Sequence, residues 1–423
     1  NFVTTVSTIY GKISVIYSTG QFGGSMADIR SYMKEKEKRE QKQEGYKEKI
    51  VRHKLAHVYR IGLLILVAGA LAALVIVQYK RHVYTDYDVI SSMARESVSG
   101  TFDIRLGDAI LTYSKDGAHC TDAKGNVTWN QNYEIQDIKL AVCSGTTAIA
   151  EYNGRNIYTA NTEKQLTQIT TTMPIRNITV SQGGYVTAIL DGTDVAVITT
   201  YDPAGKESYR GEARMNGSGY PAAISLSPGG ELLCVSYWYV DAGTLKTNIA
   251  FYNFGPIGEN ANDHMVSVYS YTDMLVPQVQ FMNDSTAFAV GDNRLMIYSG
   301  GHIPVEAAWY ALNEEIQSVF YNDKYIGLVF RSEKEDKRFR MDVYDAAANS
   351  VGSFYLDIDY TDIFFEQDKF IAYNEMQCVI TTLDGVEKFN GEFTKPVKLV
   401  LPTGRAYRYL LVTEDSVDTI QLR

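Results

Sequence analysis

The longest uninterrupted apolar segment of the chain covers residues 61–77. These 17 positions, IGLLILVAGALAALVIV, carry no charged or amide side chain. Extended to 58–79, the segment makes a helix of about 33 Å, and the hydrocarbon layer of a bilayer is about 30 Å thick. Tyr59 and Tyr79 stand where aromatic residues gather at membrane interfaces. The pattern predicts a membrane-spanning helix, with a buried core helix as the alternative.

Beyond residue 100 the pattern changes to short runs of Val, Ile, Tyr, Phe and Thr, separated by Gly, Asn, Asp or Pro. The intervals between successive groups of runs are 36 to 54 residues, and most groups hold four runs. Such a repeat is typical of a propeller blade, so the predicted fold is an all-β, eight-bladed β-propeller. The groups begin near Thr101, Ile138, Ile175, Pro221, Leu275, Ile316, Thr361 and Val397.

The last group holds only three strand-like runs, between Val397 and Leu422. Propellers commonly close when a strand from one terminus completes the sheet built by the other. We therefore expect residues 101–106, or the stalk before them, to supply the missing strand. If residues 101–106 do so, the ring has seven blades.

Two turn motifs carry a resemblance to known propellers. The turn Ser227-Pro228-Gly229-Gly230 is similar to the Ser-Pro-Asp-Gly blade turn of WD40 and related bacterial propellers, with Gly229 where Asp is usual. Residues 122–129, DAKGNVTW, resemble the Asp…Gly…Trp element of quinoprotein-type propellers, with one residue fewer between Asp and Gly. Over residues 58–423 the chain resembles an uncharacterised family of membrane-anchored propellers from Gram-positive bacteria. That resemblance implies topology and architecture, and it implies no activity.

Charge is distributed unevenly along the chain. The net charge is −10, but residues 26–60 hold 11 Lys or Arg against 6 Asp or Glu, and residues 61–423 hold 28 against 44. An acidic body of this size excludes nucleic acid as a partner. Six basic residues precede the apolar run within twenty positions and three follow it, so the N-terminus is predicted to be cytoplasmic.

These patterns predict five segments. Residues 26–57 form a basic, partly helical cytoplasmic tail, 58–79 an uncleaved signal-anchor helix in the plasma membrane, 80–100 a stalk and 101–423 an extracytoplasmic propeller. Residues 1–25 share nothing with the basic tail. We expect them to lie outside the native protein, with Met26 as its start and Gly23-Gly24 as a translated ribosome-binding site.

Candidate chemistry is sparse. There is no phosphate-binding loop, no nucleophile elbow and no pair of cysteines two residues apart. The three histidines after residue 100 lie at least 36 residues apart, so no catalytic triad or metal site is predicted. We therefore predict no catalytic, cofactor-binding or metal-binding residue and no cofactor. The cysteines are expected to be buried free thiols, with a Cys120–Cys143 bridge as the alternative. Asp357, Asp359 and Asp362 form a cluster that is expected to be a solvated edge, with Asp357 and Asp359 on one exposed strand face; the alternative is a site for a hard cation.

The favoured function is non-enzymatic binding or scaffolding at the cell envelope. The expected partners are the lipid bilayer, through the helix, and a protein, peptide or glycan, through loops at the ring faces. One alternative is an enzyme that uses the central channel: a hydrolase, a lyase or a quinoprotein-like oxidoreductase. Another is a sensor that signals through the helix. The candidate channel side chains on the innermost strands are Arg176, Asn177, Ser225, Gln278, Gln280 and Gln317.

Overall fold

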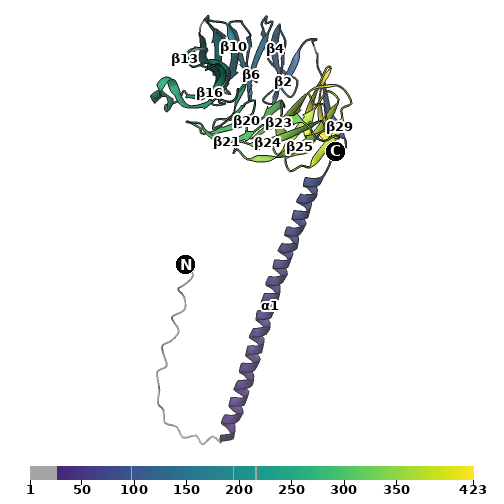
Figure 1. The fold of residues 1–423 in the computed structure, drawn as a ribbon. Coiled ribbons are helices and arrows are strands. Elements are labelled where there is room, and N and C mark those ends of the chain that lie inside the picture. Colours follow the sequence, from purple (N-terminus) through teal and green to yellow (C-terminus); the bar gives the residue numbers. More distant parts are fainter. Residues whose placement is uncertain (1–25, 97, 194, 215–216) are drawn as a thin grey trace. The chain divides into compact units, whose positions relative to one another are not determined.

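The computed structural model describes residues 26–96, 98–193, 195–214 and 217–423. The expectation about residues 1–25 therefore lies outside the described residues. The chain divides into two compact units, residues 1–80 and 81–423. In the first unit the described residues belong to one long helix, and in the second they form eight four-stranded sheets (Figure 1).

Helix α1 (Met26–Arg81) is built from residues with strong helix propensity, Ala, Leu, Glu, Lys and Arg. Within it, Arg52–Val75 is long and apolar enough to cross a membrane, and none of that segment is buried. In the polar part before it, residues 30–40 are exposed, and Glu35 and Arg39 lie 4.0 Å apart at helical spacing. The apolar segment thus has no protein surface to pack against within the described residues.

Each sheet is a blade of four antiparallel strands, and blades 1 to 8 follow one another in chain order. The innermost strands are β2 (Phe102–Leu106), β6 (Ile138–Cys143), β10 (Ile175–Val180), β14 (Tyr220–Leu226), β18 (Gln278–Asn283), β22 (Ile316–Tyr321), β26 (Asp362–Glu366) and β30 (Val397–Pro402). The second strands are β3 (Ala109–Tyr113), β7 (Thr146–Glu151), β11 (Val186–Asp191), β15 (Leu232–Asp241), β19 (Thr286–Val290), β23 (Tyr325–Arg331), β27 (Lys369–Tyr373) and β31 (Arg408–Thr413).

The outer half of each blade continues the same order. The third strands are β4 (Gly117–Thr121), β8 (Asn156–Asn161), β12 (Ala196–Tyr201), β16 (Thr244–Asn253), β20 (Arg294–Ser299), β24 (Phe339–Asp345), β28 (Gln377–Thr382) and β32 (Ser416–Leu422). The outermost strands are β5 (Val127–Asn132), β9 (Gln165–Thr170), β13 (Glu207–Ala213), β17 (Met265–Tyr271), β21 (Val305–Ala311), β25 (Ser350–Leu356), β29 (Glu387–Glu392) and β1 (Tyr87–Ala94). Two short 3₁₀ helices, η1 (Gly258–Asn260) and η2 (Asn262–His264), precede β17.

The all-β, eight-bladed propeller predicted from the sequence is confirmed. The predicted start of the innermost strand differs from the observed one by three residues at Leu275 and by at most one residue in the other blades. The ring has eight blades because β2 forms its own sheet with β3, β4 and β5. The seven-blade alternative, in which residues 101–106 complete the last blade, is therefore wrong.

Blade 8 is closed by the stalk. Strand β1 pairs antiparallel with β32, with Tyr87 opposite Leu422 and Ala94 opposite Ser416. The propeller therefore begins at Tyr87, and the predicted boundary at residue 101 is too late. The expectation that the stalk supplies the missing strand is confirmed. The alternation in β1 is weak because most of its side chains are exposed, so the sequence pattern did not give the bounds of the strand.

Apolar side chains fill the spaces between consecutive blades. In the junction of blades 4 and 5, for example, Phe251 and Tyr298 are fully buried. The junction between blades 8 and 1, where the ring closes, has the smallest buried cluster among the described residues: Ile110, Leu399, Leu401, Leu410, Val412 and Val417. Ring closure thus rests on less apolar burial than the other junctions.

Candidate functional site

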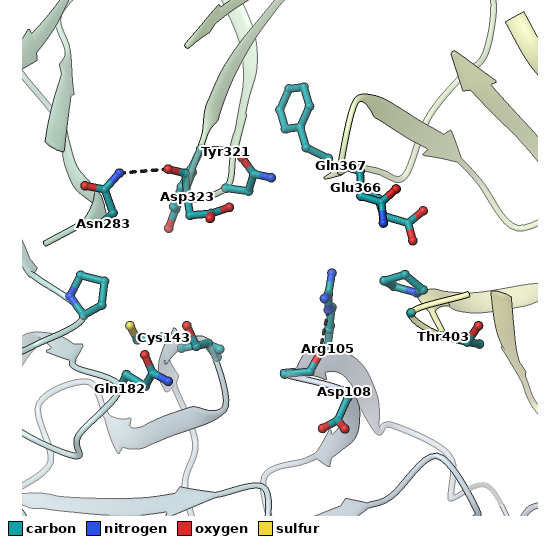
Figure 2. Close-up of a pocket in the computed structure, with 18 of the residues that line it drawn as sticks. Arg105, Asp108, Cys143, Gln182, Asn283, Tyr321, Asp323, Glu366, Gln367 and Thr403 are labelled. Carbon is teal, nitrogen blue, oxygen red and sulfur yellow. Dashed lines mark hydrogen bonds between the residues drawn. The ribbon is translucent and has the colours of Figure 1, made fainter. Parts of the chain in front are cut away.

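The turns between the first and second strands of all eight blades meet at one end of the ring. In every blade the innermost strand runs toward this end and the second strand returns, so turns at equivalent positions in the repeat are brought together. They line a cavity of about 1420 Å³, which we call the turn-face cavity (Figure 2). Every turn contributes at least one lining residue, and these include Asp108, Ser144, Gln182, Pro228, Asp284, Asp323, Gln367 and Arg405.

One side of the cavity, formed by blades 8 and 1, is rich in cations. Arg105 and Lys124 come from blade 1, and Arg405 and Arg408 come from blade 8. Arg105 points into the cavity (Figure 2), where its Nε donates to the carbonyl oxygen of Gly107 at 2.8 Å. Burial lowers the pKa of Arg105, and the nearby carboxylates of Glu366 and Asp108 oppose that shift without cancelling it.

These four cations form no close ion pair with a carboxylate among the described residues. The ion pairs of the described residues include none of them, although each lies in a cavity that also holds acidic residues. The Nε of Arg408 instead donates to the neutral side-chain oxygen of Gln421 at 3.1 Å. Most of the hydrogen-bonding capacity of these groups is therefore free to meet solvent or a ligand.

The side formed by blades 5 and 6 carries amides and carboxylates. The Nδ2 of Asn283 donates to the carbonyl oxygen of Asp323 at 3.0 Å (Figure 2), which ties the two turns together. The backbone N–H of Gly229 donates to Oδ1 of Asp284 at 2.5 Å. In an eight-bladed ring, blade 5 stands opposite blade 1. The cavity therefore has a basic side and an acidic side that face each other.

A buried polar network lies beside the cavity in blades 7 and 8. The Nζ of Lys369 is 3.0 Å from Oε2 of Glu366, and these side chains are only 4% and 12% exposed. The hydroxyl of Tyr409 donates to the same carboxylate oxygen at 3.1 Å, and burial raises the pKa of Tyr409 strongly. Lys369 thus balances the charge of Glu366, so this carboxylate contributes little net charge to the cavity.

The turn that carries Arg405 and Arg408 also holds the chain that leads to β1. Tyr407, between these two arginines, lies with its ring centroid 4.6 Å from that of Tyr84. The backbone N–H of Tyr84 donates to the carbonyl oxygen of Lys388 at 2.7 Å. Residues 82–86 are therefore fixed to the propeller at the end that bears the cavity.

The six candidate channel residues do not converge on one site. Gln280 lines the turn-face cavity, and Gln317 is exposed. Ser225 is fully buried, and its Oγ accepts a hydrogen bond from the backbone N–H of Phe281 at 2.9 Å, which joins blades 4 and 5. Arg176 forms an ion pair with Asp191 at 2.5 Å. Ser225 and Arg176 therefore stabilise the ring.

The remaining two channel residues are also accounted for locally. Asn177 accepts a hydrogen bond from the backbone N–H of Ile178 at 2.9 Å, and Gln278 is half-buried on β18. The structure thus places one of the six predicted channel residues, Gln280, in the cavity. Sequence reasoning missed Arg105, Arg405 and Arg408, although each lies within or directly beside the turn that follows an innermost strand.

The cysteines are free thiols, and the alternative bridge between Cys120 and Cys143 is not formed. Cys120, Cys234 and Cys378 are buried, whereas Cys143 is half-buried and lines the cavity. Burial raises the pKa of the Cys143 thiol. A neutral thiol of this kind is a poor nucleophile.

The aspartate cluster is only partly an exposed edge. Asp357 and Asp359 are exposed, but they lie in the connection between β25 and β26 and not on the strand face that alternation predicted. Asp362 is half-buried and accepts a hydrogen bond from the Tyr373 hydroxyl at 3.3 Å, so the exposed-edge prediction is wrong for it. Burial raises the pKa of Asp362. Among the described residues, no group of three His, Cys, Asp or Glu is placed to hold a metal ion.

The fold and the cavity define the protein as an eight-bladed β-propeller preceded by a long helix with an apolar segment. Residues 80–422 match a family described as a family of unknown function, DUF5711, and the chain belongs to that family. The match confirms that the chain belongs to an uncharacterised family, and the structure confirms the propeller fold. No curated protein matches the sequence.

Several solved structures are similar to this chain at low sequence identity. BamB from Moraxella catarrhalis is 10% identical, with 80% of this chain and 100% of that chain covered and a TM-score of 0.45. Chaetomium thermophilum Sqt1, bound to the N-terminus of ribosomal protein L10, is 11% identical, with coverage of 80% and 100% and a TM-score of 0.49. Kluyveromyces lactis Hsv2 is 8% identical, with coverage of 70% and 98% and a TM-score of 0.44.

Proposed function

We propose that the protein is a membrane-tethered binding module of the cell envelope, anchored by α1, whose turn-face cavity receives a ligand outside the cytoplasm. The observation that carries the proposal is the cavity itself: all eight blades contribute to it, and no ion pair of the described residues includes its four cations, Arg105, Lys124, Arg405 and Arg408. Arg105, Lys124 and Arg405 are exposed, so their N–H groups can meet a ligand. A ligand that pairs with them would therefore gain affinity and orientation.

Anchoring is supported by the apolar segment Arg52–Val75, none of which is buried against protein. The test is extraction of membranes with alkaline carbonate, followed by added protease on intact protoplasts. We expect the wild-type chain to remain in the membrane fraction and its propeller to be digested. The double variant Leu64→Arg/Leu71→Arg should be extracted, because each arginine costs about 2.5–3.5 kcal/mol at a helix centre. The matched control is Leu64→Ile/Leu71→Ile; a protected propeller would overturn the topology.

Ligand binding in the cavity is tested by cross-linking in native membranes, recovery of the full chain and mass spectrometry of what is bound. The variant Gln182→Trp/Thr403→Trp places two indoles in the cavity. Glu335→Trp is the control, since Glu335 is exposed in the turn between β23 and β24, outside the cavity lining. We expect the double variant to lose a bound component that the wild type and the control retain. Recovery of the same components from all three would refute cavity recognition.

The connection between the cavity and the tether favours a second function, a sensor that signals through the helix. Arg405 and Arg408 line the cavity, and Tyr407 between them packs on Tyr84, three residues after α1 ends. A ligand that shifts this turn would also shift Tyr84. The test compares hydrogen exchange in residues 82–94 between Gln182→Trp/Thr403→Trp and the Glu335→Trp control. Equal exchange in that segment would refute the coupling.

A further inference from the structure

The basic side of the turn-face cavity has the features of an anion site. We infer, on the basis of the proposed binding function, that an oxyanion group of the ligand binds to Arg105, Arg405 and Arg408 at the junction of blades 8 and 1. By oxyanion we mean a phosphate or carboxylate whose oxygens accept hydrogen bonds from guanidinium groups.

The first support is local charge. Arg105, Lys124, Arg405 and Arg408 stand on this side of the cavity, and Asp108 is the carboxylate beside them that has no cation bound to it in the described structure. The other nearby acid, Glu366, is already paired with Lys369. With Asp122 beside Lys124 also counted, the basic side therefore carries an excess of about two positive charges.

The second support is the state of the guanidinium groups. Arg105 and Arg408 each donate through Nε to a neutral oxygen, of Gly107 and Gln421 respectively. Those bonds fix the side chains and leave the outer N–H edges unused, which is the arrangement that a planar anion meets with two parallel hydrogen bonds. Arg105 is exposed, so an anion can reach its guanidinium group, and contact with an anion would oppose the lowering of its pKa.

The third support is the space between the blades. The junction of blades 8 and 1 has the smallest apolar cluster in the described ring, and the cavity lining continues there past the turns to Leu410 and Thr419. Arg105 approaches from blade 1, and Arg405 and Arg408 approach from blade 8. An anion seated there would be held from both sides, and it would bridge the junction at which the ring closes.

The experiment titrates the full chain in detergent with inorganic phosphate, and separately with acetate, and follows binding by isothermal calorimetry. Arg405→Gln and Arg105→Gln remove one guanidinium each. The control is Arg338→Gln, an exposed arginine outside the cavity lining. Loss of one charged hydrogen-bonding group should weaken phosphate binding by about tenfold or more, and Asp108→Asn should strengthen it. Arg405→Lys should recover only part of the affinity, because lysine keeps the charge and loses the planar fork.

Three results would overturn the inference: no binding of phosphate or acetate, equal binding by Arg405→Gln and the control, or weaker binding by Asp108→Asn. Unfolded variants are identified by tryptophan fluorescence, since all three Trp residues lie in the propeller. The source of the anion is tested with short-chain phosphatidylglycerol against phosphatidylcholine of equal length. If the tryptophan-filled cavity loses its cross-linked component while phosphate never binds, the binding function stands and the anion site fails.

Discussion

The pair formed by Lys369 and Glu366 offers a quantitative test of the network beside the cavity. Replacing Lys369 by Met preserves the length of the side chain and leaves Glu366, whose side chain is 12% exposed, with Tyr409 as its hydrogen-bond donor. Removing one partner of a buried ion pair costs about 3–5 kcal/mol, since the remaining charge stays in a poorly solvated site. Replacing both charges with neutral groups of similar volume is often close to neutral.

The expected shift in melting temperature follows from the size of the propeller. An unfolding entropy of about 2.1 cal/mol/K per residue over about 340 residues gives roughly 0.7 kcal/mol/K, so a loss of about 4 kcal/mol lowers Tm by about 6 °C. Thermal unfolding of the full chain in detergent, followed by tryptophan fluorescence, measures this shift in the propeller alone. The double variant Lys369→Met/Glu366→Gln should recover most of the lost Tm. A double variant no more stable than Lys369→Met would refute the reasoning.

Three further predictions use the same measurement or simple labelling. Burial raises the pKa of Asp362 in the folded state, so the protein is most stable when this carboxyl is protonated, below about pH 4, and loses that stability as the pH rises through the folded-state pKa. Asp362→Asn should therefore raise Tm at pH 7 and leave it unchanged near pH 3. Gly230 and Gly385 have φ values of +80° and +86°. A Cβ on Gly230 would lie 3.0 Å from an aromatic ring, whereas a Cβ on Gly385 would meet open space. Gly385→Ala should therefore cost about 1 kcal/mol and Gly230→Ala clearly more, and equal losses would contradict the packing argument. A thiol reagent should modify Cys143 before the three buried cysteines, at a rate that rises with pH because burial raises its pKa; mass spectrometry that finds another cysteine labelled first would contradict the cavity lining.

The architecture was predictable because blade chemistry is local. Strand runs end at turns that Gly, Asp and Pro make possible, and the same turn geometry recurs: Oδ1 of Asp202 accepts from the N–H of Ala204 at 2.9 Å, while Gly205 takes a φ of +82°. These signals lie within a few residues of each other, so they can be read from the chain. Strand β1 gave no such signal, because it is held by backbone pairing to β32 and buries few side chains.

The side chains of the site were harder to predict because their partners are distant in sequence. Ser225 has the character of a channel residue, yet it bonds the backbone N–H of Phe281, 56 residues away. Asp362 and Asp359 look alike in the sequence, but Asp362 begins an innermost strand and is half-buried, whereas Asp359 precedes that strand and is exposed. Burial and pairing of this kind are properties of the closed ring, and no local pattern reports them.

Some residues at the cavity are explained by the needs of the turn backbone, and the arginines are not. Turns select Asn, Asp, Gly, Ser and Pro because these residues satisfy or permit the turn backbone, and residues such as Asn283, Asp323 and Pro228 at the cavity are explained in this way. Arginine serves no such purpose in a tight turn. Arg105 and Arg405 nevertheless project from neighbouring blades to the same side of one cavity, without carboxylate partners in the described structure. Turn geometry does not account for Arg405, and Arg105 lies on strand β2, so their chemistry supports the proposed recognition of a ligand.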